Sequence, residues 1–358
     1  MTPRCRPLFR RRNAVRAVLV LSLLAATCAQ AQQAGWLLVG VARRVGDPHD
    51  AEVVDLRTGA RRPLPIGRTN SKRGTGFDNW SASRASAHTL LRTNNVGDVD
   101  FIDSESLRTV ASFSLKSISN ARAPAFWGTP RLSPDGRYVL AYWSRDVYRD
   151  KPELLVLDRS GRIVDEGSPL QYDSRRVTEA ASWLPDGRYV YLADDRIVVH
   201  QPGTSRNLSA PLRVPDGVHA GTAQLEASPD GHHLALLLGQ IWPDSSGESR
   251  LHGVLFVSNL DGTNLHQVTK PSPSLQARGS NYSHVNPRWS PDGRWIAFTP
   301  RTVNPYGALR YFSPCVSTRM VSAEGGVEAV DDGQIADQRL LKANGSPVTS
   351  CSFIEWFD

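Results

Sequence analysis

Histidine is the residue type in this sequence best suited to binding a metal, and one histidine stands at the beginning of a predicted strand. The segment SHVNPRWSPDG places His284 and Asn286 at the entrance of that strand, where side chains can point into a central channel. A metal site needs three or four converging ligands, and the other candidates, His200, His219 and His252, are scattered along the chain. We therefore predict no metal and no other cofactor. His284 is interpreted as a hydrogen-bonded polar residue and is kept as a candidate for binding a ligand.

The catalytic motifs that can be recognised in a sequence are missing from all 358 residues. There is no Gly-x-Ser-x-Gly elbow of a serine hydrolase. There is also no phosphate-binding loop, dinucleotide fingerprint, His-Glu-x-x-His or Cys-x-x-Cys pair. The sequence therefore favours a non-enzymatic binding protein. The alternative is a lyase or hydrolase that acts on polysaccharide, with a metal or an acid/base group in the channel.

A repeated turn positions these residues. Pro-Asp-Gly precedes an apolar run in LSPDGRYVLAYWS, WLPDGRYVYLADD, ASPDGHHLALLLG and WSPDGRWIAFTP. Proline presets φ, aspartate bonds the nearby backbone and glycine takes the left-handed position, which together predict a hairpin turn. The runs that follow are typical of strands. Turn chemistry thus explains the repeated aspartates without calcium, and we expect Trp80, Trp183 and Trp289, which precede the turns, to pack between repeats.

The spacing of the repeat predicts the fold. The turn aspartates lie at positions 135, 186, 230 and 292, which are 51, 44 and 62 residues apart. Such spacing suits a four-stranded propeller blade with variable loops. Two more copies, AEVVDLRTGA and VDFIDSESLR, raise the repeat count to six. GWLLVGVARR near the start and SCSFIEWFD at the end each match part of a blade. We predict an all-β, six-bladed β-propeller closed by pairing of the N- and C-terminal strands in one blade.

The pattern WSPDGRWIAF followed by LFVSNLDGTNLHQVT resembles the WD40-like (PD40) repeats of TolB-type six-bladed propellers. The resemblance covers nearly all of the chain after residue 31 and implies a periplasmic protein of the Gram-negative cell envelope. The same repeat occurs in prolyl oligopeptidase propellers and polysaccharide lyases, so it indicates a fold more than a function. TolB itself carries an α/β domain ahead of its propeller. Because this sequence passes from leader to first repeat within a few residues, its membership of the Tol machinery is in doubt.

The first 31 residues have the features of a secretory signal peptide. They contain six arginines and no acidic residue, then the apolar run AVLVLSLLAA and the small residues TCAQA. The run is about half the length that a bilayer crossing needs. We therefore predict cleavage after Ala31 and a periplasmic mature chain, residues 32–358, without a transmembrane span. The alternative is a lipoprotein whose first residue is Cys28, because LAATC is similar to a bacterial lipobox.

The predicted cleavage also changes the charge of the protein. The chain has 42 basic and 35 acidic residues, and removing six arginines leaves 36 against 35, a mature net charge of +1. This balance gives no reason to expect nucleic-acid binding.

Cys315 and Cys351 are the two cysteines in the predicted mature chain. In an oxidising compartment they are expected to form a disulfide. The alternative is two unpaired buried thiols.

Long segments between the predicted strands should emerge on the face opposite the Pro-Asp-Gly turns. Aromatic residues and arginines are enriched in recognition surfaces, and these segments contain both. We therefore predict that they bind an envelope protein or peptide, with the candidate binding residues Phe126, Trp127, Tyr148, Trp242, Tyr282, His284 and Tyr306. The alternative is that some of these side chains only cover loop backbones or the mouth of the channel.

Overall fold

The elements of the described chain are β-strands, which confirms the all-β prediction. The computed structural model describes residues 35–41, 50–64, 79–82, 88–93, 97–114, 125–144, 153–166, 181–193, 195–205, 207–219, 224–243, 247–273, 281–303, 316–330, 342–350 and 354–357. Within these ranges, no helix has the length and apolar character needed to cross a membrane.

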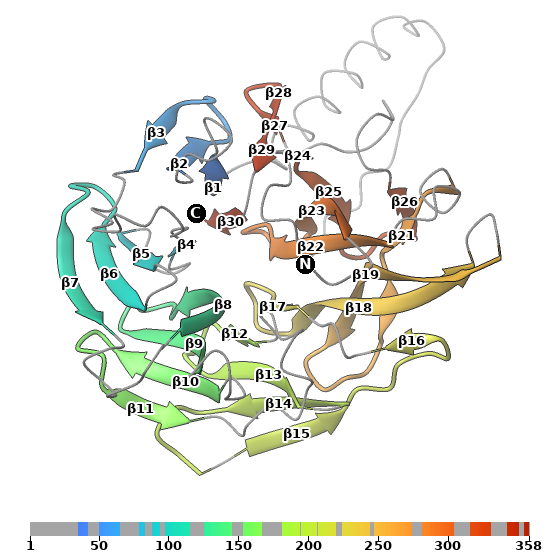
Figure 1. Cartoon of the computed structure of the whole chain (residues 1–358), viewed down its shortest axis with the longest axis horizontal. Coiled ribbons are helices and arrows are strands. Elements are labelled where there is room, and N and C mark those ends of the chain that lie inside the picture. The colour runs from blue at the N-terminus through green and yellow to red at the C-terminus, as the bar shows by residue number, and fades with distance from the viewer. Residues whose placement is uncertain are drawn as a thin grey trace, which may run out of the picture.

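The strands form radial sheets around a common centre, the arrangement of a β-propeller (Figure 1). The first sheet contains β1 (Trp36–Val41), β2 (Asp50–Asp55), β3 (Arg61–Pro63) and β30 (Ile354–Phe357). The second contains β4 (Asn79–Ala82), β5 (Thr89–Thr93), β6 (Asp98–Asp103) and β7 (Thr109–Ser114). The third contains β8 (Ala125–Leu132), β9 (Tyr138–Ser144), β10 (Glu153–Asp158) and β11 (Ile163–Glu166). The fourth contains β12 (Ala181–Trp183), β13 (Tyr189–Ala193), β14 (Arg196–His200) and β15 (Asn207–Pro211).

The remaining strands form one large sheet and three small pairs. The large sheet contains β16 (Val218–His219), β17 (Leu225–Ala227), β18 (His233–Pro243), β19 (Ser249–Asn259), β20 (His266–Gln267), β22 (Asn281–Trp289), β23 (Trp295–Val303) and β25 (Arg319–Ser322). The pairs are β21 (Thr269–Pro271) with β26 (Glu328–Val330), β24 (Val316–Ser317) with β29 (Thr349–Ser350), and β27 (Lys342–Ala343) with β28 (Ser346–Pro347).

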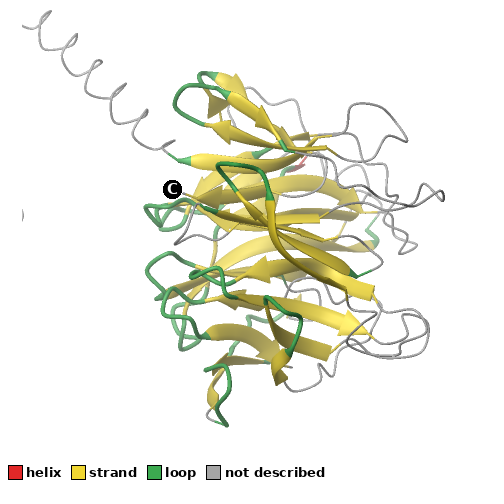
Figure 2. Ribbon diagram, turned by 90° about the vertical axis from the view of Figure 1, so that its left-hand side faces the viewer, coloured by secondary structure: helices red, strands yellow, loops and turns green. Residues whose placement is uncertain are grey.

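Within each radial unit, the strand nearest the centre is followed by strands further out (Figure 1). The strands nearest the centre are β4, β8, β12, β17, β22 and β30. Viewed from the side, the strands run from one face of the disc to the other (Figure 2). Each face of the disc is therefore formed by one set of strand ends together with the turns and loops that connect them.

The first and last described strands, β1 and β30, lie side by side in the first sheet. β30 pairs with β1 in antiparallel register, from Trp36 opposite Phe357 to Val39 opposite Ile354. A sheet built from the first and last described strands gives β1 a partner on each side, because β2 pairs with its other edge.

The large sheet arises where two radial units touch. β19 and β22 are joined by a single parallel pair, Gly253 with Ser283. A Cβ atom on Gly253 would lie 2.2 Å from the Ser283 hydroxyl oxygen and 3.0 Å from the Ser283 Cβ, so a larger residue here would force neighbouring side chains to shift.

Apolar clusters fill the spaces between neighbouring sheets. Leu91 and Phe101 of the second sheet, for example, pack with Val139 and Leu155 of the third. Equivalent clusters join β1 and β2 to β5 and β6, β9 and β10 to β13 and β14, and β13 and β14 to β18 and β19. Two more join β18 and β19 to β23 and β25, and β23 and β25 to β1 and β2. The core is therefore distributed around the disc, because each sheet buries its faces against its neighbours.

The repeated turns have the predicted chemistry. At the first, Gly136 donates its N–H to the Ser133 carbonyl (2.9 Å) and has a φ of 68°. The Ser133 hydroxyl donates to Asp135 (2.7 Å) and accepts the N–H of Tyr138 (2.9 Å). Burial raises the pKa of Asp135, but hydrogen bonds from Ser133 and Arg137 outweigh it, so the pKa lies below its usual value. The same serine and aspartate bonds recur at Ser228 and Ser290.

A fifth Pro-Asp-Gly serves another purpose. Pro215 accepts the N–H of Val218 (3.1 Å) and Gly217 has a φ of 77°, so this tripeptide also forms a turn. It lies in the loop before β16, on the periphery of the disc, and Pro215 is exposed. The tripeptide alone therefore does not mark the start of a radial unit.

Candidate functional site

The inner strands carry polar or charged residues at one equivalent position. In four of them this residue stands three places before the turn proline: Arg131 before Pro134, Ser182 before Pro185, Glu226 before Pro229 and Arg288 before Pro291. Ser81 in β4 and Glu355 in β30 occupy the equivalent position without the turn motif, as their pairing with the next strand shows. The fold thus brings one such side chain from each inner strand to the centre.

Four of these residues form the central cluster: Arg131, Glu226, Arg288 and Glu355. The Arg131 Nη1 atom lies 3.0 Å from Glu226 Oε2 and 3.3 Å from Glu355 Oε1. The Arg288 Nε atom lies 3.0 Å from Glu355 Oε2, and its Nη1 atom lies 3.7 Å from Glu226 Oε2. The two glutamates therefore each face both arginines.

The central cluster is almost completely buried. Side-chain exposure is 1% for Arg288, 3% for Glu226, 6% for Glu355 and 9% for Arg131. Ionised groups are costly to bury unless they are paired and hydrogen-bonded. The balance of two positive and two negative groups meets that requirement, and links strands β8, β17, β22 and β30 across the centre.

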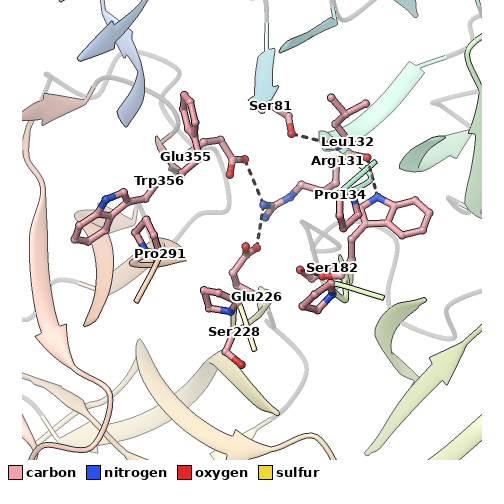
Figure 3. Close-up of a pocket in the computed structure, with 14 residues that line it drawn as sticks. Ser81, Arg131, Leu132, Pro134, Ser182, Glu226, Ser228, Pro291, Glu355 and Trp356 are labelled. Atoms are coloured by element: carbon pink, nitrogen blue, oxygen red, sulfur yellow. Dashed lines mark hydrogen bonds and ion pairs between the residues drawn. The ribbon is translucent and has the colours of Figure 1, made fainter. Parts of the chain in front are cut away.

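A cavity of about 190 Å³ lies beside the central cluster (Figure 3). Among the residues that the structure describes, those that line it and carry a charge are Arg131, Glu226 and Glu355. The rest of its lining is formed by Ser81, Leu132, Pro134, Ser182, Trp183, Pro185, Ser228, Pro229, Pro291, Trp356 and Phe357. Because four turn prolines line the cavity, it lies at the ends of the inner strands that carry the Pro-Asp-Gly turns. This end of the disc is opposite the one where the sequence predicted the binding surface.

Side chains from neighbouring sheets fix the inner strands in place. The indole N–H of Trp183 donates to the Arg131 carbonyl, and that of Trp289 donates to the Glu226 carbonyl, both at 3.0 Å. The Ser81 hydroxyl accepts the N–H of Leu132 (3.3 Å). These bonds give partners to inner-strand backbone groups, and so hold the cluster residues in position.

The predicted packing between repeats is confirmed for Trp183 and Trp289, which belong to apolar clusters between neighbouring sheets. Trp80 does not occupy the same place in its strand as these two residues. Trp80 precedes Ser81, whereas Trp183, Trp289 and Trp356 each follow the equivalent position. Trp80 therefore stands two residues before the place in the strand that Trp183 and Trp289 occupy.

Two of the predicted binding residues have described side chains. Trp242 is half-buried near the end of β18, where it packs against an apolar cluster and its ring centre lies 5.7 Å from that of His252. His284 is fully buried, and its Nδ1 atom lies 2.7 Å from the Thr269 hydroxyl oxygen. Neither residue lines the cavity. Their role in binding stays a prediction.

The other predicted residues lie outside what the structure describes. The backbones of Phe126, Trp127 and Tyr282 belong to β8 and β22, but their side chains are not among those described. Tyr148, Tyr306, Cys315 and Cys351 lie outside the described residues. The binding surface and the disulfide therefore also stay predictions.

The buried histidines are held neutral by their surroundings. Burial lowers the pKa of His284 to about 3, with a smaller contribution from the nearby His252. Burial also lowers the pKa of His252. Elsewhere His200 lies with its Nε2 atom 2.8 Å from Asp165 Oδ2. In the described ranges, no three His, Cys, Asp or Glu side chains are grouped so that they could hold a metal ion.

A pattern in the sequence marks the positions of the central cluster. Alternate residues of a buried strand should be apolar, yet Arg131, Glu226 and Arg288 occur at one fixed distance before three of the turns. An alignment of the repeats on their prolines would have shown this position.

Comparison with known proteins adds little to this description. No family model matches the chain, and no curated protein matches it. A solved structure similar to it is the β-propeller domain of Cps50 (Swd1) from Myceliophteria thermophila, at 15% sequence identity and a TM-score of 0.46. The match covers 82% of this chain and 81% of that one. We carry neither a function nor a partner over from this likeness.

Proposed function

We propose that this chain is a non-enzymatic binding protein whose central cavity receives a segment of an envelope protein or peptide. The observation that carries the proposal is the mixed lining of the cavity. Prolines and the aromatic residues Trp183, Trp356 and Phe357 surround a floor formed by charged groups. Concave sites with apolar walls and a few converging polar groups are typical of ligand binding.

The alternative is a lyase or hydrolase that acts on polysaccharide, and the cavity supports it less well. Such an enzyme needs an acid/base pair, an activated nucleophile or a metal. The floor carboxylates of Glu226 and Glu355 are already engaged by arginines. Among the described residues, no histidine lines the cavity beside its serines. Binding without chemistry therefore fits this lining better.

We also propose that the disc is a six-bladed propeller of the TolB-like, PD40-repeat type. Three observations support six blades. The equivalent inner position is occupied six times, by Ser81, Arg131, Ser182, Glu226, Arg288 and Glu355. In the described part of the chain, six apolar clusters lie between neighbouring units. The pairing of β1 with β30 supports closure of the ring in one blade.

The proposed location is the periplasm, reached through a signal peptide that is removed after Ala31. The arginine-rich, apolar leader supports this proposal. The intact mass of the exported protein should correspond to residues 32–358, less two hydrogens for a disulfide between Cys315 and Cys351. An acylated Cys28 at the N-terminus would instead support a lipoprotein.

Selection from a random peptide library displayed on phage tests the binding function. Peptides enriched on the purified protein should bind the Pro229→Trp variant at least about tenfold more weakly, because the indole would fill the cavity. Pro215→Trp is a matched control. Pro215 begins another copy of Pro-Asp-Gly, and it does not line the cavity. Equal binding to both variants, or no enrichment at all, would contradict the proposal. Cleavage of a polysaccharide that is lost only in Pro229→Trp would favour the enzyme.

A further inference from the structure

We infer that the central cavity receives the apolar ring of a phenylalanine side chain carried by the bound peptide segment. The inference rests on the proposed binding function and adds the chemistry of the ligand. Three features of the cavity support it: polar lining groups that already have partners, apolar walls, and a volume of about 190 Å³.

The polar side chains of the lining are engaged within the protein. Arg131 pairs with Glu226 and Glu355. Arg288 lies beside the same two carboxylates, so the four groups together carry no net charge. The lining serines accept backbone N–H groups: Ser81 from Leu132 (3.3 Å), Ser182 from Ala227 (3.1 Å) and Ser228 from His233 (2.9 Å). A charged ligand would therefore give up its hydration without a net counter-charge from the described lining.

The walls of the cavity are apolar. They consist of four turn prolines, Leu132 and the rings of Trp183, Trp356 and Phe357. In Figure 3, Pro134 lies on one side of the contacts that Arg131 makes, and Pro291 and Trp356 lie on the other. Such walls favour burial of apolar surface, and contacts between aromatic rings add to that gain. A ligand ring therefore gains more here than an aliphatic side chain of the same size.

The volume of the cavity fits one ring. An engineered apolar cavity of about 150 Å³ in another protein takes up benzene, and this cavity has about 190 Å³. Typical small-molecule sites are larger, at roughly 300–1,000 Å³. A buried tyrosine hydroxyl usually needs a hydrogen-bond partner, and the serines of this lining are already engaged. Phenylalanine therefore fits better than tyrosine.

Trp36 extends the apolar surface at the mouth of the cavity. It stands opposite Phe357 in the pairing of β1 with β30, so both side chains lie on the same face of the sheet. Trp36 is 38% exposed, whereas Phe357 is 5% exposed. The residue before it, Gly35, adjoins the cavity lining, because a Cβ there would lie 3.3 Å from both Pro291 Cγ and the Trp356 indole nitrogen. Trp36 is thus placed to pack against peptide residues next to the phenylalanine.

The test uses the peptides selected on phage, resynthesised with defined changes. We expect the peptides that Pro229→Trp excludes to share a phenylalanine at one position. Replacing this phenylalanine by alanine should weaken binding to the wild-type protein at least about tenfold, because the burial of the ring is lost. Replacing it by tyrosine should weaken binding about fivefold or more, because the added hydroxyl would be buried without a partner. Isothermal titration calorimetry measures these affinities.

A pair of protein variants tests the mouth of the cavity. Trp36→Ala should weaken binding of the same peptides about threefold or more, because apolar contact area is lost. Leu208→Ala is the control, since Leu208 is also apolar and exposed but lies in β15, away from the cavity. Equal affinities for the two variants would overturn the role assigned to Trp36.

The outcomes separate this inference from the proposed function. Peptides that Pro229→Trp blocks, but that share another residue type or tolerate alanine or tyrosine in place of phenylalanine, would overturn the inference and leave the binding function standing. Failure to enrich any cavity-dependent peptide would remove the proposed function, and the inference with it. The peptide changes are measured on wild-type protein, so their result does not depend on the folding of a variant.

Discussion

Arg288 is the side chain on which the centre of the molecule depends most. It is 1% exposed and lies between the carboxylates of Glu226 and Glu355, with Arg131 on their other side. A charge in such a place is tolerated because it is paired with opposite charges, and removing one member leaves an uncompensated charge in the interior. The cluster therefore acts as a specific connection between strands that are distant in sequence.

The first prediction concerns this residue. Arg288→Met should lower the free energy of unfolding by about 3–5 kcal/mol, because the two glutamates lose their buried partner. Arg294→Met is the control, since Arg294 is 63% exposed and pairs with Asp292 on the surface. Exposed pairs contribute about 0–1 kcal/mol. Urea unfolding measures both, and equal losses would contradict the role assigned to the cluster.

The second prediction concerns pH. The pKa of His284 is lowered to about 3, so the folded protein keeps this side chain neutral while the unfolded chain takes up a proton below about 6.5. Stability that is present at pH 7 should therefore be lost as the pH falls from about 6.5 towards 3. His284→Gln should reduce the slope of unfolding free energy against pH by about 1.4 kcal/mol per unit near pH 5. An unchanged slope would show that His284 is protonated in the folded state.

At the scale of the elements, the features that local sequence determines were predictable, whereas the contacts between distant segments were not. The Pro-Asp-Gly turns and the strands after them follow from residues within a few positions of each other, and the structure has these hairpins. The parallel contacts of β19 with β22 and of β21 with β26 join segments without any local signal. They depend on how neighbouring units pack, which a repeat pattern does not specify.

The sequence marks the position of the central cluster residues before the turns, but not the contacts between them. Each member of the central cluster stands alone in its own strand, and Arg131 and Glu226 are 95 residues apart. Only the ring arrangement brings them together. His284 was a candidate for binding a ligand because imidazole can bind metals and polar groups. In the structure it is buried against Thr269 and Phe298 and does not line the cavity.

The third prediction tests the contact between β19 and β22. Gly253→Ala should lower the free energy of unfolding by about 1–3 kcal/mol, because the new methyl group would meet the Ser283 hydroxyl oxygen at 2.2 Å. At Gly326 a Cβ would meet nothing within 4 Å and the backbone has no positive φ, so Gly326→Ala is the matched control. Chemical denaturation of both variants measures the difference. Equal changes in unfolding free energy for the two variants would mean that the contact between β19 and β22 does not require the small residue at Gly253.

At the scale of the whole molecule, we expect stability to depend on the pairing of the first and last described strands, β1 and β30. β30 supplies Glu355 to the central cluster, and buries Trp356 and Phe357, which are 1% and 5% exposed. Its loss would expose one edge of β1 and open the cavity wall.

The fourth prediction follows from this arrangement. A chain ending at Ser350 should lose more than about 5 kcal/mol, since removing each large buried aromatic side chain costs about 3–5 kcal/mol. That loss is comparable with the whole stability of a domain, about 5–15 kcal/mol. Calorimetry should show no cooperative unfolding transition. A shortened chain that unfolds at the wild-type temperature would contradict the proposed closure through β30.

The most direct test of the account is hydrogen–deuterium exchange with and without a peptide selected on the protein. We predict slower exchange of the amides in residues 224–231 and 354–357, which border the cavity, and no change in β15 (Asn207–Pro211) at the rim of the disc. Protection confined to the end of the β18–β19 hairpin around Trp242, with residues 224–231 unchanged, would place the binding surface elsewhere and contradict the account.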